Sequence, residues 1–383
     1  MPFSARQGFF SGVVSVTKQW YEVSNTEILA DIATWNRTTA YATANTAVSL
    51  SGIYTSSQAF LGGTLHTNGN IYYPPFTSSS GNILCFNPAA NTVTSIPTGL
   101  SITGTYKHYS GILARDGKIY FPPINAGKIL IIDPNNNNAC SQQTWGLTLG
   151  NYDCSVYAHD LNKIYCIGSA THCLIVDLTA NTATQSNFSG IISGTTQNRY
   201  VAGTYALKKQ RVVFAPYNST HFLLIDPVTD TAQAQGFGLA ISAGACQGCT
   251  NGKDGNVWAT ATSTTGGGRT YTVDLAANTA IIASSQSISS GGGAGMGSDG
   301  NVWVGCFPGG QTGFANVDTK VVQVNPTFMG TSSRTNPVLA LDGLVYAITQ
   351  DVNGPVIRHY PQGSGASSPI LKEIALSGYF NHR

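Results

Sequence analysis

Apolar residues in this chain come in short runs separated by turn residues. The clearest stretch is Asp116–Pro134, DGKIYFPPINAGKILIIDP. Asp116-Gly117 is a tight hairpin signal, and Lys118–Phe121 and Lys128–Ile132 are rich in β-branched and aromatic residues, which predicts a strand-turn-strand unit. Neither strand alternates cleanly between apolar and polar positions. Both faces of the pair must therefore be covered, which a lone hairpin cannot achieve.

The same phrase recurs along the chain. The second hairpin residues lie 43 to 48 positions apart, at 69, 117, 162, 210, 255, 300 and 343. The second strand repeats in step, and an Asn-Thr pair often follows it, at Asn91-Thr92, Asn181-Thr182 and Asn278-Thr279. Seven copies at this period predict a β-propeller, in which neighbouring blades bury each other's faces.

The predicted fold class is all-β: a seven-bladed β-propeller of four-stranded antiparallel blades over residues 57–383. A short N-terminal extension with one helix, residues 1–56, precedes it and is expected to be a docking segment. The last repeat supplies four strands of its own if Pro355–Tyr360 is followed by a strand at Ile370–Leu376. This pattern does not determine how the ring closes. One alternative is that a strand from the N-terminal segment pairs with the last blade.

The N-terminal segment carries a capping box, Ser24-x-x-Glu27, which predicts a helix over Asn25–Trp35 with Ile28, Leu29 and Ile32 on one face. Two interpretations stand: a helix packed against the ring, or an arm that docks on another subunit. The first residues lack the pattern of a signal peptide, and no stretch reaches the roughly 18 apolar residues of a membrane helix. We therefore expect no membrane insertion.

Composition limits the classes of function that are expected. Charged residues make up 9% of the chain and the net charge is +2, so nucleic-acid binding by phosphate neutralisation is not expected. The chain has eight cysteines, most of them in predicted strands, and we expect free thiols because so large a core needs no disulfides. Cys246-x-x-Cys249 is the one metal-like spacing, and we interpret it as structural. No metal and no cofactor is predicted.

The candidate binding site is the channel mouth, formed by the connections between blades and by the loops between second and third strands. Tyr recurs at the same point in three successive blades, beside a different polar residue each time. Rings, amides and guanidinium groups suit sugar or peptide contacts, although the tyrosines could equally pack the channel wall. The candidate residues are Lys107, His108, Tyr109, Tyr152, Asp153, Arg199, Tyr200, Arg334 and Asn336.

Acidic residues argue against catalysis. Only three are Glu, and none of these lies in a predicted mouth loop. Nine Asp residues are expected to cap turns: Asp116, Asp133, Asp177, Asp226, Asp254, Asp274, Asp299, Asp318 and Asp342. Asp153 near His108 or Arg199 could form an acid/base pair, but a polar cluster explains the three residues equally well. We predict no catalytic residues and no enzyme.

The repeat, with its DGKIYFPP and ILIIDP halves, resembles the propeller superfamily of virginiamycin B lyase-like, quinoprotein-like and NHL-type proteins. The resemblance covers residues 57–383 and implies the fold. It does not imply lyase activity, because no Glu stands where that family has its His and Glu pair. The opening MPFSARQGFF resembles the leader of tailed-bacteriophage virion proteins.

The resulting hypothesis is a structural or adhesion protein of a bacteriophage particle, on tail or capsid, located in the virion after assembly in the host cytoplasm. Its expected partners are other virion proteins, through the N-terminal segment, and a host-surface glycan or protein. The alternative is a bacterial propeller enzyme of the lyase-like class or a free carbohydrate-binding lectin.

Overall fold

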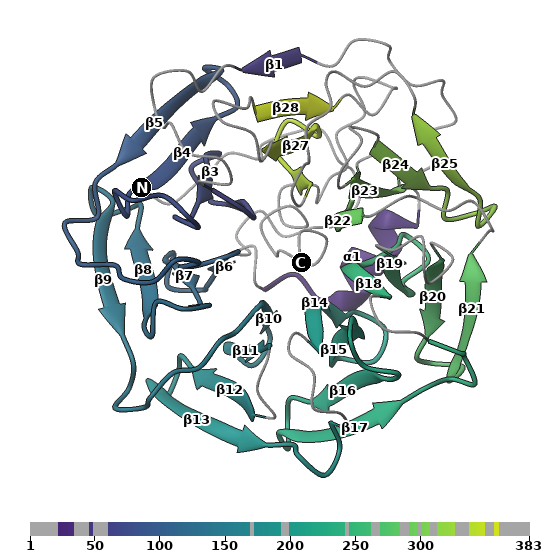
Figure 1. Cartoon of the computed structure of the whole chain (residues 1–383). Coiled ribbons are helices and arrows are strands. Elements are labelled where there is room, and N and C mark those ends of the chain that lie inside the picture. Colours follow the sequence, from purple (N-terminus) through teal and green to yellow (C-terminus); the bar gives the residue numbers. More distant parts are fainter. Residues whose placement is uncertain are drawn as a thin grey trace.

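Seven four-stranded antiparallel sheets stand around a common centre (Figure 1). This is a computed structural model, and it describes residues 22–33, 46–48, 60–168, 172–192, 199–241, 245–261, 269–283, 291–297, 300–306, 312–325, 337–348 and 356–359. Within these ranges there is one helix, α1 (Asn25–Ile32). The predicted all-β, seven-bladed fold is confirmed.

Six blades are built from consecutive strands, with the first strand of each nearest the centre (Figure 1). Blade 1 comprises β2 (Thr64–Leu65), β3 (Ile71–Tyr73), β4 (Ile83–Asn87) and β5 (Thr92–Ile96). Blade 2 comprises β6 (Ile112–Leu113), β7 (Ile119–Phe121), β8 (Ile129–Asp133) and β9 (Ala139–Gln143). Blade 3 comprises β10 (Cys154–Ala158), β11 (Lys163–Ile167), β12 (His172–Asp177) and β13 (Thr182–Asn187). Blade 4 comprises β14 (Tyr200–Ala206), β15 (Arg211–Pro216), β16 (Phe222–Asp226) and β17 (Thr231–Gln235). Blade 5 comprises β18 (Cys246–Asn251), β19 (Val257–Ala261), β20 (Thr270–Asp274) and β21 (Thr279–Ala283). Blade 6 comprises β22 (Gly291–Met296), β23 (Val302–Cys306), β24 (Thr312–Ala315) and β25 (Val322–Asn325).

Turn chemistry explains why the phrase repeats. The second hairpin residue has a positive φ in every copy, with Gly in five copies and Asn162 and Gln210 in the other two. The recurring Asn of the Asn-Thr pairs occupies the left-handed region too, with φ of 56° at Asn91, 53° at Asn181 and 54° at Asn278. Asn tolerates this conformation better than other residues with a Cβ. The repeat therefore marks the two turns on one face of each blade, which we call the turn face.

The core lies between neighbouring blades. Strands β11, β15 and β18 bury nearly every residue, whereas every residue of the outer strands β5, β9 and β13 is exposed or half-buried. The inner strands approach closely where they carry glycine. A Cβ on Gly203 would lie 2.7 Å from Val156 Cγ2 of the preceding blade, and one on Gly248 would lie 2.6 Å from the Ala294 nitrogen of the next.

Blade 7 differs from the prediction for the last repeat. Its strands are β26 (Val338–Leu339), β27 (Val345–Ile348), β28 (Val356–His359) and, on the outside, β1 (Thr46–Val48). β1 pairs antiparallel with β28, with Ala47 opposite Ile357. The N-terminal alternative for closure is therefore correct, and β1 takes the outer place expected for Ile370–Leu376, which lies outside the described residues. The domain boundary at residue 56 leaves this strand on the wrong side.

The predicted helix forms α1, and it begins with the capping box. Ser24 Oγ accepts from the Glu27 amide at 3.2 Å, and Glu27 Oε2 accepts from the Ser24 amide at 2.8 Å. α1 packs against the turn face of blades 4 and 5: Asn25 Nδ2 donates to Leu207 O at 3.3 Å, and the Leu29 side chain lies over Gly255. Ile28 and Ile32 are buried. The interpretation of a helix packed against the ring is confirmed. No helix in the described residues is long and apolar enough to span a bilayer.

Candidate functional site

The face opposite the turns, which we call the mouth face, is held together by backbone bonds between successive blades. The amides of His108, Tyr152 and Ala245 donate to carbonyls of the preceding blade, to Pro75 O at 3.2 Å, Pro123 O at 2.9 Å and Tyr217 O at 3.1 Å. Each connection is therefore fixed against the end of the previous blade's second strand. The side chains of these connections are presented by rigid backbone, not by free loops.

The structure brings most of the predicted mouth residues into this layer. Tyr109, Tyr152 and Asp153 line one crevice between blades 2 and 3, together with Ser110, Pro122, Cys154 and Ser155. The crevice has no room for a water molecule, so it is a narrow seam between two blades. A Cβ on Gly168 would lie 2.5 Å from Asn151 O and 2.7 Å from the Asp153 nitrogen, so glycine is needed for the backbone to approach this closely. Arg199 and Tyr200 belong to the next connection, before blade 4, and Arg334 and Asn336 lie outside the described residues.

The repeated tyrosines pack the wall rather than face solvent. Tyr152 is 2% exposed and its hydroxyl accepts from Gln185 Nε2 at 3.0 Å, while Tyr200 is 1% exposed and its hydroxyl lies 3.1 Å from Ser219 Oγ. Burial raises the pKa of both phenols. These two rings support the channel, as the packing alternative proposed.

His108 is completely buried in the same layer. Its Nδ1 lies 3.2 Å from Pro122 O, and Nε2 has no hydrogen-bond partner among the described residues. Burial lowers the pKa of His108 to about 4, so the ring is neutral at pH 7. A neutral ring enclosed by backbone acts as a structural element of the mouth, and it does not line the crevice.

A small aromatic cluster stands on the mouth face apart from the main core. Leu61, Phe76, Tyr109 and Ile124 form its buried part. Tyr106 covers it: its ring stacks on Phe76 with centroids 5.0 Å apart, and Tyr106 is 45% exposed. Sequence reasoning missed Tyr106, because the search followed the position at which Tyr recurs. The fact that Tyr106 directly precedes Lys107 in a connection was the available signal.

Most of the described Asp residues named above cap turns, as predicted. Asp116 accepts from the Lys118 amide at 3.1 Å and the Tyr120 hydroxyl at 2.8 Å, and Asp274 accepts from the Ala276 amide at 2.9 Å. Asp318 is the exception. Asn316 caps that turn by accepting from the Asp318 amide at 3.0 Å, because β24 ends earlier than the repeat suggested. Asp299 lies outside the described residues.

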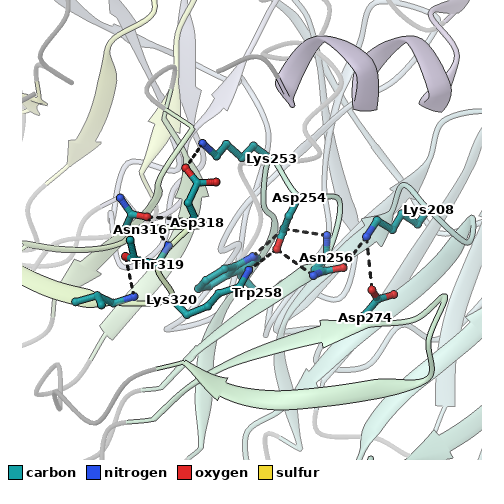
Figure 2. Close-up of polar contacts among 11 residues, drawn as sticks. Lys208, Lys253, Asp254, Asn256, Trp258, Asp274, Asn316, Asp318, Thr319 and Lys320 are labelled. Carbon is teal, nitrogen blue, oxygen red and sulfur yellow. Dashed lines mark hydrogen bonds and ion pairs between the residues drawn. The ribbon is translucent and has the colours of Figure 1, made fainter. Parts of the chain in front are cut away.

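The freed Asp318 carboxylate joins a charged network on the turn face, which is the second candidate site (Figure 2). Lys253 Nζ lies 2.5 Å from Asp318 Oδ2, and Lys320 Nζ lies 2.6 Å from Asp254 Oδ2 and 4.7 Å from the centre of the Trp258 ring. Lys208 Nζ donates to Asn256 Oδ1 at 2.8 Å. Every ammonium group of the network is paired across a blade boundary, so the cluster links blades 4, 5 and 6 and leaves no charge for a ligand.

We expect Lys320→Met to lower the free energy of unfolding by about 1 kcal/mol, because it removes a partly exposed ion pair and a cation–π contact. The loss should shrink at high salt, where the ion pair is already screened. Urea unfolding at low and high NaCl measures both effects. Lys209→Met, at an exposed turn position, is the matched control and should change little. An equal loss in both variants would contradict the assigned role.

The thiols and the metal-like spacing behave as structural elements. Seven cysteines are free among those whose side chains the structure describes, and burial raises the pKa of both Cys246 and Cys249. Both side chains are completely buried in β18. No group of three or more potential metal ligands occurs in the described parts of the chain.

Comparison with known proteins places the fold. No family model matches the chain, and no curated protein matches it. Among solved structures it is similar to a streptogramin B lyase at 13% identity and a TM-score of 0.66, over 83% of this chain and 97% of the lyase. It is also similar to the extracellular domain of a putative one-component system from B. thetaiotaomicron (10% identity, TM-score 0.60, 82% of this chain and 40% of that one) and to a chain of a mitotic checkpoint complex (10%, 0.62, 94% and 99%). At these identities the likeness concerns the fold alone.

Proposed function

We propose that the protein is a structural and adhesion component of a bacteriophage particle, displayed on tail or capsid, that contacts a glycan or protein of the host surface. The observation that supports this most is the exposed Tyr106 ring on the Phe76 cluster of the mouth face. Exposed aromatic groups on rigid support are typical of binding sites, because they bury a large area at a small entropic cost.

The two faces of the ring suit two different attachments. α1 lies on the turn face, against Leu207 and Gly255, and we propose that the N-terminal segment attaches to the particle from that side. Tyr106 lies on the mouth face. An N-terminal segment that docks on other virion proteins would thus leave the aromatic cluster pointing away from the particle. Because α1 and β1 bind the ring itself, the docking contacts are assigned to residues 1–21.

Composition supports a virion location as well. A large β protein with 9% charged residues and many Gly, Ser, Thr and Asn suits life outside a cell. Virion proteins meet this condition, because they leave the host by lysis. We propose a non-catalytic role, since most described carboxylates are engaged in turns or ion pairs.

We expect Tyr106→Ala to weaken binding of the purified protein to host cells by about tenfold, because truncation of an aromatic anchor costs 1 kcal/mol or more. Cell-binding curves with labelled protein measure this. Ile281→Ala is the matched control, because Ile281 is 52% exposed on the outer strand β21, away from the mouth. Equal binding by both variants would show that Tyr106 on the mouth face does not contact the host cell.

Display on a particle is tested separately. Antibodies against the purified protein should label particles in immunogold electron microscopy. Labelling of cells without particles would favour the alternative, a free lectin or a bacterial propeller enzyme.

A further inference from the structure

The outer strand β21 differs from the other outer strands in what it presents to solvent. It lies at the rim of blade 5 (Figure 1), and no described strand pairs with its outer edge. Ile281 is 52% exposed and Ile282 is 41% exposed. No other strand residue whose side chain the structure describes is large, apolar and exposed. Because neighbouring strand residues point to opposite faces, β21 carries one exposed aliphatic side chain on each face.

The strand register shows that this arrangement is particular to blade 5. Ile281 lies in one row with Thr272 and Trp258, and Ile282 lies in one row with Tyr271. In the matching rows of blades 1 to 4, the outer strand has only Thr, Ser, Gln or Ala: Thr94, Ser95, Ser141, Gln142, Thr184, Gln185, Gln233 and Ala234. Where blade 5 has Thr272, blades 2 to 4 have the aliphatic residues Ile131, Ile175 and Leu224. Blade 5 thus has the polar residue inside and the apolar residue outside.

The fold itself gains nothing from this exchange. Thr272 is 3% exposed, and its hydroxyl has no hydrogen-bond partner in the described part of the chain, so its burial carries a desolvation cost. Ile281 and Ile282 leave much of their apolar surface in water. Exposed aliphatic side chains on an open strand edge favour association, and soluble proteins usually avoid them. The pair therefore indicates a contact surface.

The edge of β21 lacks the features that block strand pairing. Its five residues include no charged residue and no proline, and its register with β20 is free of bulges. Arg269 lies just before β20, at the Ala283 end of the edge, and is exposed. Asp274 lies at the other end, where it is paired with Lys208 at 3.7 Å. If a second copy adds antiparallel, the Arg269 end of each copy meets the Asp274 end of the other, whereas a parallel pair brings like charges together.

The strand is also complementary to itself in the antiparallel orientation. With Ile281 opposite its own copy, Ile282 lies opposite Ala280 of the second strand. A large side chain then meets a small one on one face, and the two Ile281 side chains cover each other on the opposite face. We propose that β21 is a self-association edge, through which two copies of the chain join by antiparallel pairing about a two-fold axis at Ile281. This inference goes beyond the proposed adhesion function and does not depend on it.

The small size of the contact sets its strength. β21 offers five residues a side, whereas a stable interface has roughly 20 to 30. We therefore expect weak association, with a dissociation constant of about 10 µM or higher. Copies held close together on a particle exceed such concentrations locally. Labelled protein at nanomolar concentration stays monomeric, so Ile281→Ala remains a valid control for cell binding.

Sedimentation velocity of the purified full chain, from about 1 to about 200 µM, tests this inference. We expect the sedimentation coefficient to rise with concentration toward that of a dimer. Ile281→Lys places two like charges opposite each other and should raise the dissociation constant at least tenfold. Gln233→Lys is the matched control, because Gln233 is exposed in the matching row of blade 4, and it should associate like the unaltered chain. Both variants should keep the melting temperature of the unaltered chain, since both side chains are exposed.

Cross-linking tests the register separately. Ile281→Cys should give a covalent dimer with oxidised glutathione, because directly opposed positions of an antiparallel pair lie within the span of a disulfide. Gln233→Cys should stay monomeric under the same conditions.

A chain that stays monomeric at about 200 µM would overturn the inference, and a strand of another protein would then be the occupant of the edge. Association that is equally strong in Ile281→Lys and Gln233→Lys would overturn it too, because the copies would then meet elsewhere. Adhesion is measured on Tyr106→Ala, so the failure of either proposal leaves the other standing.

Discussion

Deletion of residues 1–48 should destabilise the propeller severely, by about 5 kcal/mol or more. The deletion removes β1, which forms the outer strand of blade 7, and α1, which buries Ile28 and Ile32 against the turn face, together with the buried Val23 that precedes it. Each fully buried aliphatic side chain contributes about 1.5 to 3 kcal/mol. The backbone edge of β28 would also lose its partner. In differential scanning calorimetry we expect the melting temperature to fall by roughly 10 °C.

A shorter deletion provides the control. Removal of residues 1–21 leaves α1 and β1 in place, and should leave the melting temperature near that of the full chain while abolishing attachment to the particle. Equal melting of the full chain and the chain lacking residues 1–48 would show that the N-terminal strand does not close the ring.

Acid should destabilise the folded protein between about pH 6.5 and pH 4. Burial lowers the pKa of His108 to about 4, and burial also lowers the pKa of His159, against the opposing effect of Asp160. In this window the unfolded chain binds a proton at each histidine that the folded chain does not bind. The free energy of unfolding therefore falls as the pH falls, by roughly 3 kcal/mol for His108 alone, since one pKa unit corresponds to about 1.4 kcal/mol.

Urea unfolding at pH 7.5 and at pH 4.5 measures this effect. His108→Gln and His159→Gln should each be less stable at pH 7.5, yet each should lose less stability on acidification than the unaltered chain. The double variant should show the shallowest dependence. An unchanged difference between the two pH values in the double variant would contradict the assignment to these buried rings.

Sequence reasoning predicted the blades because their turns are chemically demanding. Gly117 and Asn181 occupy left-handed conformations that few residues tolerate, so the same residue types recur at a fixed spacing. Closure by β1 could not be derived in this way. Three residues, Thr46–Val48, carry too little pattern to indicate a strand, and the edge that they complete belongs to the other end of the chain.

The candidate site was predicted only in part for a similar reason. Periodicity draws attention to positions that repeat, such as Tyr152 and Tyr200, and these are buried in the channel wall. Tyr106 matters because of one local arrangement, an exposed ring stacked on Phe76, and this arrangement does not recur at a fixed position of the repeat in the described blades. Only the folded chain shows that Tyr106 covers the cluster.

We propose that the ring presents its mouth face to the host, while the face that carries α1 is attached to the particle. A cryo-electron microscopy density map of intact particles tests this most directly. We predict a ring of seven blades attached through the face that carries α1, with Tyr106 facing outward. A map that shows the mouth face buried against tail or capsid, or particles without the ring, would contradict it.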